Sequence, residues 1–329
     1  MPNPILVEIT RGALVETIHR GSIAIADAEG IVRFALGDIQ TPVYPRSSLK
    51  PIQALTLVES GAAEAFGVGD EEVALACASH SGEPMHTERV AAWLARIGCG
   101  ESDLACGPQA PRYEPASQEM LRRGDKPTRI HNNCSGKHTG FLTVARHWNV
   151  ATAGYERVDH PVQQAVVTSL RALSGVEKLP WGVDGCAAPN FALPLAGFAR
   201  ALAKLAGGKT PGAARIVRCM IAYPELVGGT DRACTVMMRA AARRAAVKTG
   251  AEGVYAGIIP ERGLGIALKI DDGATRAAET TIAAILDKLG MLGDGAREFL
   301  QAPVLNTRGA IVGERRPAPA LSQADLVGL

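Results

Sequence analysis

Strand-like segments stand at both ends of this 329-residue chain, and the region between them has the pattern of helices. Alternating or β-branched residues bounded by turn residues are typical of antiparallel strands. The predicted strands cover residues 5–9, 13–16, 22–27, 31–35, 253–259 and 264–270. We therefore expect an α/β fold of the α+β kind, with one antiparallel sheet built from both chain termini and backed by a helical lobe.

Apolar residues at helical spacing predict helices through the middle of the chain. These helices cover residues 48–60, 87–97, 141–148, 161–173, 195–205, 213–222 and 234–247, and a last one covers 275–292. We expect residues 1–329 to form a single two-lobed catalytic domain, with a sheet lobe from residues 1–45 and 250–329 and a helical lobe from residues 46–249. The Pro-rich segment 316–319 is expected to be a poorly ordered end.

Composition excludes several classes of protein. The formal net charge of +2 is close to neutral and the basic residues are dispersed, which argues against a nucleic-acid surface. Seven scattered cysteines, an odd count, fit reduced thiols better than a disulfide framework. No apolar run approaches the roughly 18 residues of a membrane span, and the amino end lacks the pattern of a signal peptide. We therefore expect a cytoplasmic protein that binds neither nucleic acid nor a membrane.

Ser47 stands three residues before Lys50 at a predicted helix start. Positions i and i+3 share a helix face, so the hydroxyl and the amine would point into the same space. A serine is a weak nucleophile until a base takes its proton, and a lysine amine can be that base. Alone, this spacing is a weak signal, and a capping serine beside an exposed lysine is the commoner interpretation. The same spacing with a Lys-Thr-Gly partner marks serine enzymes that react with β-lactams, and the chain also carries Lys248-Thr249-Gly250.

Two further segments concentrate polar and reactive residues between apolar stretches. Residues 77–84 contain Ser79 and His80, for which plain turn and cap chemistry is an equally good interpretation. Residues 131–140 contain two histidines, two amides, a thiol and a lysine. The glycines of this segment permit close approach of a ligand, and its amides could bind an amino-acid head group. It lacks the glycine spacing of a phosphate-binding loop.

A fourth segment, residues 181–189, carries Asp184 and Cys186 among turn residues. Cys186 and Cys134 could together bind a soft metal ion. Without Cys-x-x-Cys spacing they are a weak zinc signal, and two buried structural thiols are the better interpretation of the pair taken alone.

Together these segments resemble the rhizobial-type, zinc-binding L-asparaginases, a family related in fold to serine β-lactamases and glutaminases. The matching runs are residues 46–51, 77–81, 133–138, 182–186, 234–238 and 248–250, in family order through most of the chain. Any one run would be unspecific, whereas the joint match is specific. The resemblance implies a β-lactamase/glutaminase-like fold. It also implies a cytoplasmic homodimer that hydrolyses L-asparagine to L-aspartate and ammonia.

The resemblance also implies a role for each site residue. Two Ser–Lys pairs would share one cleft, Ser47 with Lys50 and Ser79 with Lys248. A zinc ion would be held by Cys134, Lys137 and Cys186, with Asp184 near it through water. Beyond the resemblance, we expect the substrate to be bound by Arg46, Asn133, His80 and Asp184, with the planar guanidinium of Arg46 on its α-carboxylate. Ser47 is the preferred nucleophile, although Ser79 has an equally good lysine partner. Because the Ser–Lys pairs already supply a nucleophile and a base, zinc would organise the site and would not attack the substrate through a bound water.

Three alternatives remain open from the sequence. A glutaminase or a β-lactam-reactive serine hydrolase would share the fold and the motifs, but the lack of a signal-peptide pattern and of a Ser-Asp-Asn motif argues against the β-lactam reaction. A non-catalytic zinc or amino-acid sensor could have kept the same pocket. Release of ammonia from asparagine or glutamine would distinguish these alternatives.

Overall fold

The computed structural model describes residues 1–326 and 328–329, which divide into two compact units. The sheet unit comprises Met1–Ser48, Leu193–Gly207 and Val236–Leu329. The helical unit comprises Leu49–Ala192 and Gly208–Thr235. The predicted mixed fold, with an antiparallel sheet drawn from both chain ends and a separate helical part, is confirmed. That the two units act as one catalytic domain stays a prediction.

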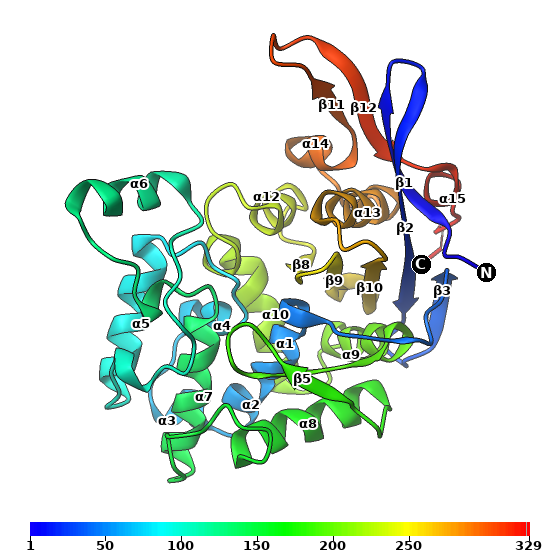
Figure 1. Ribbon diagram of the computed structural model, residues 1–329. Helices are drawn as coiled ribbons and strands as arrows, with labels where there is room; N and C mark the ends of the chain where they lie inside the picture. The colour runs from blue at the N-terminus through cyan, green and yellow to red at the C-terminus, as the bar shows by residue number, and fades with distance from the viewer. Residues whose placement is uncertain (327) are drawn as a thin grey trace. The chain divides into compact units, whose positions relative to one another are not determined.

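The sheet unit is built on an eight-stranded sheet in the order β11-β12-β1-β2-β10-β9-β8, with β3 paired to β2. All of these pairs are antiparallel. Strands from the two ends of the chain lie side by side, as the blue β1 and the red β12 of Figure 1 show. The strands are β1 (Ile5–Arg11), β2 (Leu14–Ala26), β3 (Val32–Leu36), β8 (Ala246–Thr249), β9 (Val254–Ile259), β10 (Leu264–Ile270), β11 (Ala302–Leu305) and β12 (Ile311–Pro317). A separate pair joins β4 (Pro42–Val43) to β7 (Leu193–Pro194).

Two helices, α9 (Leu195–Ala206) and α13 (Thr275–Lys288), cover opposite faces of this sheet. Side chains alternate between the faces of a strand, so neighbouring residues of β10 point in opposite directions. Gly265 lies directly under one helix, where an added Cβ would be 2.1 Å from the backbone nitrogen of Ala203. Gly257, which pairs with Ile266, faces Ile282 of the other helix. The helices of the sheet unit are α9 (Leu195–Ala206), η4 (Pro260–Arg262), α13 (Thr275–Lys288), η5 (Asp294–Ala296), α14 (Arg297–Leu300) and α15 (Pro319–Ser322).

The helical unit consists of short helices packed around α4 and α7, with one small β-hairpin. An added Cβ on Gly136 would lie 2.4 Å from the carbonyl oxygen of Leu75, so only glycine allows α7 to pack this closely on α4. The helices are α1 (Lys50–Gln53), α2 (Leu55–Glu59), α3 (Ala62–Ala65), α4 (Asp70–Ala76), α5 (Pro84–Arg96), η2 (Glu101–Asp103), α6 (Glu114–Arg123), η3 (Arg129–His131), α7 (Ser135–His147), α8 (Pro161–Ser174), α10 (Pro211–Ala222) and α11 (Pro224–Val227). The hairpin joins β5 (Trp181–Val183) to β6 (Pro189–Phe191).

Several sequence predictions about elements are wrong. The strands expected at residues 13–16 and 22–27 are one continuous strand, β2, because its central residues keep pairing with β1. The helix expected at 234–247 ends with α12 (Ala233–Ala240), since Ala242 and Arg243 adopt positive φ angles and β8 follows. The segment 316–319 is not a loose end, because Arg316 and Pro317 pair with β1.

The helix expected at residues 48–60 is divided into η1 (Arg46–Leu49), α1 and α2. Pro51 fits the first turn of α1, where a missing N–H costs nothing. Among the described residues, no helix is long and apolar enough to cross a membrane.

Candidate active site

The helical unit brings Lys50 and Ser79 together. Lys50 is the first residue of α1 and is 1% exposed. Its Nζ lies 3.1 Å from Ser79 Oγ, donates to the carbonyl of Ala78, and lies 3.4 Å from the carbonyl of Asn133. Carbonyl oxygens only accept hydrogen bonds, whereas a hydroxyl can donate or accept. The amine therefore donates one N–H to each of the two carbonyls. Its remaining position faces the hydroxyl of Ser79, and of these three partners only the hydroxyl can exchange a proton with the amine.

The loop that carries Ser79 is held by the end of α11 and the segment that follows it. The backbone N–H of Ser79 donates to the carbonyl of Val227 at 3.0 Å, and Ser81 Oγ donates to the carbonyl of Gly228 at 3.1 Å. The buried carboxylate of Glu83 accepts from the N–H and the hydroxyl of Thr230, at 2.8 and 2.6 Å. The loop follows the C-cap of α4 and ends at the N-cap of α5, so both of its ends are fixed by helices.

His80 is buried and both of its ring nitrogens have protein partners. Its Nδ1 accepts from the N–H of Gly82 at 3.1 Å, so Nε2 carries the proton and donates to Ser135 Oγ at 2.9 Å. Burial, with the charge of His86 beside it, lowers the pKa of His80 well below its ordinary value, so the ring is neutral. His80 thus connects the Ser79 loop to the start of α7, and its predicted contact with substrate stays a prediction.

Two thiols and an amine converge beside this loop. The Nζ of Lys137 lies 3.0 Å from the sulfur of Cys186, and Cys134 Sγ lies 3.0 Å from Asn133 Oδ1. Hydrogen bonding from Cys134 and the charge of Lys137, opposed by burial, lower the pKa of Cys186 to about 4. The hydrogen bond with Cys186, together with burial, raises the pKa of Cys134 to about 12. Within this cluster the charge of Lys137 and the hydrogen bond from Cys134 favour the thiolate form of Cys186 over that of Cys134.

Asp184 begins the turn that presents Cys186 on the β5–β6 hairpin. Its N–H donates to the carbonyl of Ala188 at 2.9 Å, and Ala187 takes a positive φ of 73° to close the turn. Burial lowers the pKa of Lys137, but the charges of Cys186 and Cys134 and, less strongly, that of Asp184 outweigh it and raise this pKa above its ordinary value. The turn therefore places a carboxylate within electrostatic reach of the lysine.

The other predicted site residues belong to the sheet unit. Arg46 has a positive φ of 53°, Ser47 is half-buried in η1, and Lys248 lies on β8, is 1% exposed and donates to the carbonyl of Thr249 at 2.9 Å. An added Cβ on Gly250 would lie 2.5 Å from the carbonyl oxygen of Pro45, so the Lys-Thr-Gly turn packs against the segment that carries Ser47.

The two predicted Ser–Lys pairs, Ser47–Lys50 and Ser79–Lys248, each join residues of different units and stay predictions. The contact between Lys50 and Ser79 was not predicted, because the two residues are 29 positions apart and no local spacing signals their meeting. Glu83 was also missed as the carboxylate that fixes the Ser79 loop. Its place shortly before the predicted helix 87–97 was the only available signal.

His138 and Tyr155 form a further buried pair that the sequence did not indicate. The N–H of Ala105 donates to Tyr155 Oη at 2.9 Å, and the phenol lies 2.6 Å from His138 Nδ1, which leaves the proton on Nε2. That nitrogen is buried without a hydrogen-bond partner among the described residues. Burial, with the nearby charge of Lys137, lowers the pKa of His138 to about 3.

Acid is expected to destabilise the protein through His138. An unfolded histidine has a pKa of 6.5, so between pH 6.5 and 3 the unfolded chain binds the proton that folded His138 refuses, and stability is lost as the pH falls. This residue should account for a loss of about 1–2 kcal/mol in the free energy of unfolding between pH 6.5 and about 5. Urea unfolding at both pH values should show a smaller pH dependence for His138→Asn than for wild type or for the surface control His147→Asn. Equal pH dependence in all three would contradict this.

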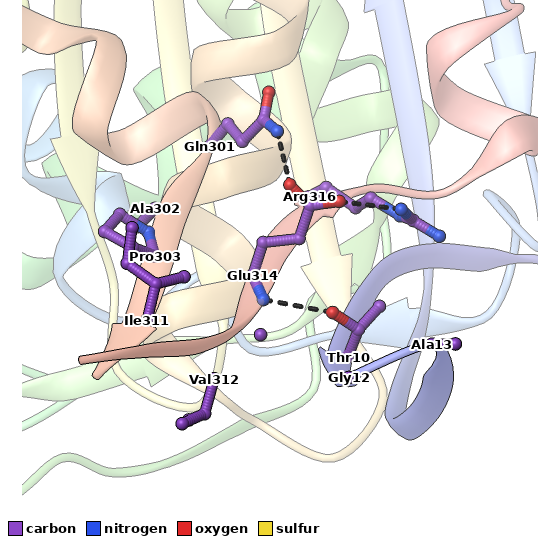
Figure 2. A pocket seen from close by; sticks show the side chains of 11 residues that line it. Thr10, Gly12, Ala13, Gln301, Ala302, Pro303, Ile311, Val312, Glu314 and Arg316 are labelled. Atoms are coloured by element: carbon purple, nitrogen blue, oxygen red, sulfur yellow. Dashed lines mark hydrogen bonds and ion pairs between the residues drawn. The ribbon is translucent and has the colours of Figure 1, made fainter. Parts of the chain in front are cut away.

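None of these residues lines a cavity of about 660 Å³ in the sheet unit (Figure 2). It is bounded by β1, β11 and β12. Its polar side chains bond to one another, with Glu314 joined to Gln301 and Arg316 and its N–H donating to Thr10. The charges of Glu314 and Arg316 are therefore already paired within the cavity wall.

A family model described as L-asparaginase II matches residues 7–317, and the chain belongs to that family. No curated protein matches the chain.

Solved structures match the chain with low identity. The crystal structure of Mglu in its native form is 16% identical, with a TM-score of 0.46 over 84% of this chain and 66% of its own. Mglu in its L-glutamate binding form is 17% identical, with a TM-score of 0.43 over 78% and 58%. A β-lactamase from Mycobacterium bovis is 15% identical, with a TM-score of 0.35 over 78% and 89%. The chain spans slightly less than two thirds of the native Mglu chain. TM-scores below 0.5 support no inference about function.

Proposed function

We propose that this protein is an L-asparaginase, which hydrolyses L-asparagine to L-aspartate and ammonia. Membership of the L-asparaginase II family supports the reaction class. The observation that carries the mechanism is the 3.1 Å contact between Lys50 Nζ and Ser79 Oγ. A buried amine whose other partners are two carbonyls is suited to accept a proton from the one hydroxyl beside it.

The proposed reaction is acyl transfer through a serine ester. Ser79 Oγ attacks the side-chain amide carbon of asparagine while Lys50 takes the hydroxyl proton. Lys50 then gives this proton to the departing ammonia as the carbon–nitrogen bond breaks. Water attacks the resulting aspartyl ester with Lys50 again as base, which releases aspartate and restores the serine. The two carbonyls keep the amine in place through both proton transfers.

Residues of the sheet unit are proposed to complete the site. Lys248 remains the predicted partner of Ser79, and Ser47, the predicted partner of Lys50, remains the alternative nucleophile. Arg46 suits a substrate carboxylate because its planar guanidinium can bind both oxygens. In the helical unit, the side chain of Asn133 would hold the substrate head group.

We propose further that Cys134, Lys137 and Cys186 hold a zinc ion. Among the described residues no three His, Cys, Asp or Glu side chains form a metal-binding group, so this site depends on the lysine. The sulfur of Cys186 lies 3.0 Å from the amine of Lys137 and hydrogen-bonds with Cys134, so two sulfurs and an amine gather around one point, which fits a soft ion. Both Lys137 and Cys134 must lose a proton to bind it. When bound, zinc would supply positive charge that orders the site.

Purified protein is expected to contain about one zinc ion per chain. Elemental analysis should find this zinc lost in Cys134→Ser and Cys186→Ser and kept in the control Cys99→Ser, a half-buried thiol outside the cluster. Removing the ion from wild type should raise KM for asparagine more than it lowers kcat. Zinc retained in both site variants would contradict the ligand set. Complete, reversible loss of turnover at saturating asparagine would contradict the ordering role.

Ammonia release by the wild-type protein tests the reaction itself. We expect release from L-asparagine with kcat/KM at least about tenfold above that for L-glutamine, because one extra methylene displaces the amide carbon from Ser79. Preference for glutamine would favour a glutaminase, and hydrolysis of a β-lactam would favour a β-lactam-reactive hydrolase. Tight binding of either amino acid without ammonia release would favour a sensor.

A further inference from the structure

Two arginines flank the Ser79 loop in the helical unit. The N–H of Arg112 donates to the carbonyl of Ser81 at 2.8 Å. The hydroxyl of Ser81 bonds to Gly228, and an added Cβ on Gly228 would lie 3.2 Å from Cβ of Arg232. The backbone of Arg112 is therefore bonded to Ser81, two positions after the proposed nucleophile, and Arg232 lies beside Gly228, which accepts the bond from the Ser81 hydroxyl.

Neither guanidinium has an acidic partner among the described residues. This differs from other arginines of the same unit, such as Arg89 with Glu71 and Arg215 with Glu64 and Asp70. The charge of Arg232, after burial, lowers the pKa of Arg112, which agrees with the closeness of their backbone anchors. Two like charges held together repel each other, and an anion between them would relieve this repulsion.

We propose that Arg112 and Arg232 form the site that binds the α-carboxylate of the substrate, which deepens and rests on the proposed asparaginase function. In asparagine only Cβ and Cα separate the amide carbon from the α-carboxylate carbon, so its carboxylate must lie close to the attacking serine. Arginine pairs suit carboxylates because each guanidinium presents parallel N–H donors. The pair therefore selects free amino acids over asparagine residues within peptides, whose carboxyl group is an uncharged amide.

This assignment changes the role expected for Arg46. Arg46 would then contact another part of the substrate or support the site indirectly. The two assignments make different predictions for a substrate without an α-carboxylate.

The test compares L-asparagine with asparagine α-amide, which lacks the carboxylate charge, in Arg112→Gln, Arg232→Gln and Arg46→Gln. A matched control is Arg122→Gln, an exposed arginine of α6 that pairs with Glu119. Each variant at the arginine pair should lower kcat/KM for L-asparagine at least about tenfold and leave that for the α-amide within about twofold. Arg112→Lys should restore part of the loss, because it restores the charge. Thermal melting verifies that each variant is folded.

Calorimetric binding of L-aspartate separates this proposal from the proposed function, because it needs no turnover. Wild type should bind L-aspartate, and the Gln variants of the pair should bind it at least about tenfold more weakly. Wild type that binds aspartate through the pair but releases no ammonia would overturn the function and keep the site. Unchanged binding and selectivity in both pair variants, loss of selectivity only in Arg46→Gln, or no aspartate binding by wild type would overturn the arginine site.

Discussion

Ser79→Ala is expected to lower kcat for L-asparagine by ~10³-fold or more, because it removes the attacking oxygen while the rest of the site remains. The KM should change by less than about threefold, since the hydroxyl forms no contact needed for ground-state binding. The melting temperature should change little, because the Ser79 loop keeps its backbone hydrogen bond to Val227 and the two hydrogen bonds that Thr230 donates to Glu83. Steady-state ammonia release measures the first two effects.

Ser174→Ala is the matched control for this substitution. Ser174 is also buried, and its hydroxyl bonds to the carbonyl of Leu170 within its own helix, far in sequence from the site. Its activity should equal that of wild type. If Ser79→Ala keeps about a tenth of wild-type kcat and Ser47→Ala is inactive, Ser47 is the nucleophile and the assignment made from the Lys50–Ser79 contact is wrong.

Lys50→Met is expected to lower kcat by about 10²–10⁴-fold, because it removes the proposed base while keeping a side chain of similar length. The double variant with Ser79→Ala should be no slower than the Ser79→Ala variant, since the two residues act as one unit. Lys50→Arg should fail to restore activity, because a guanidinium stays protonated and cannot act as a base. These kcat values come from the same ammonia assay.

Lys50→Met also leaves the carbonyls of Ala78 and Asn133 without a donor, so a lower melting temperature is expected. Activity must therefore be compared at a temperature where each variant is folded. Additive effects of the Lys50 and Ser79 substitutions would contradict a shared proton-transfer step. Substantial activity in Lys50→Arg would contradict the base assignment directly.

Much of the fold was predictable because its signals are local. Alternating residues in β2 and β10 and the apolar helices α8 and α9 indicated their own structure. The positive φ angles at Ala242 and Arg243, which end α12, have no comparable signal, because neither residue is one that favours that conformation. Strand β12 was missed because Glu314, Arg315 and Arg316 are consecutive charged residues, so the strand lacks the alternation of apolar and polar residues that signals a strand.

The site was predictable as a set of residues and unpredictable as a set of contacts. Ser-x-x-Lys spacing drew attention to Lys50, but it could not reveal that Ser79, in the loop between α4 and α5, lies 3.1 Å from the Lys50 amine. Cys134 and Lys137 share one turn of α7, so their proximity was predictable, whereas Cys186 reaches them from a hairpin some fifty residues away. Arg112 and Arg232 have no shared motif, and only the bonds around Ser81 reveal that they are neighbours.

The most direct test of a Ser79 acyl-transfer mechanism is mass analysis of wild-type protein quenched in acid during turnover of L-asparagine. The mechanism predicts an aspartyl ester on the peptide that contains Ser79, absent from the Ser79→Ala variant and from wild type quenched before substrate is added. An ester on the Ser47 peptide, or continued turnover by Ser79→Ala at the wild-type rate, would contradict it.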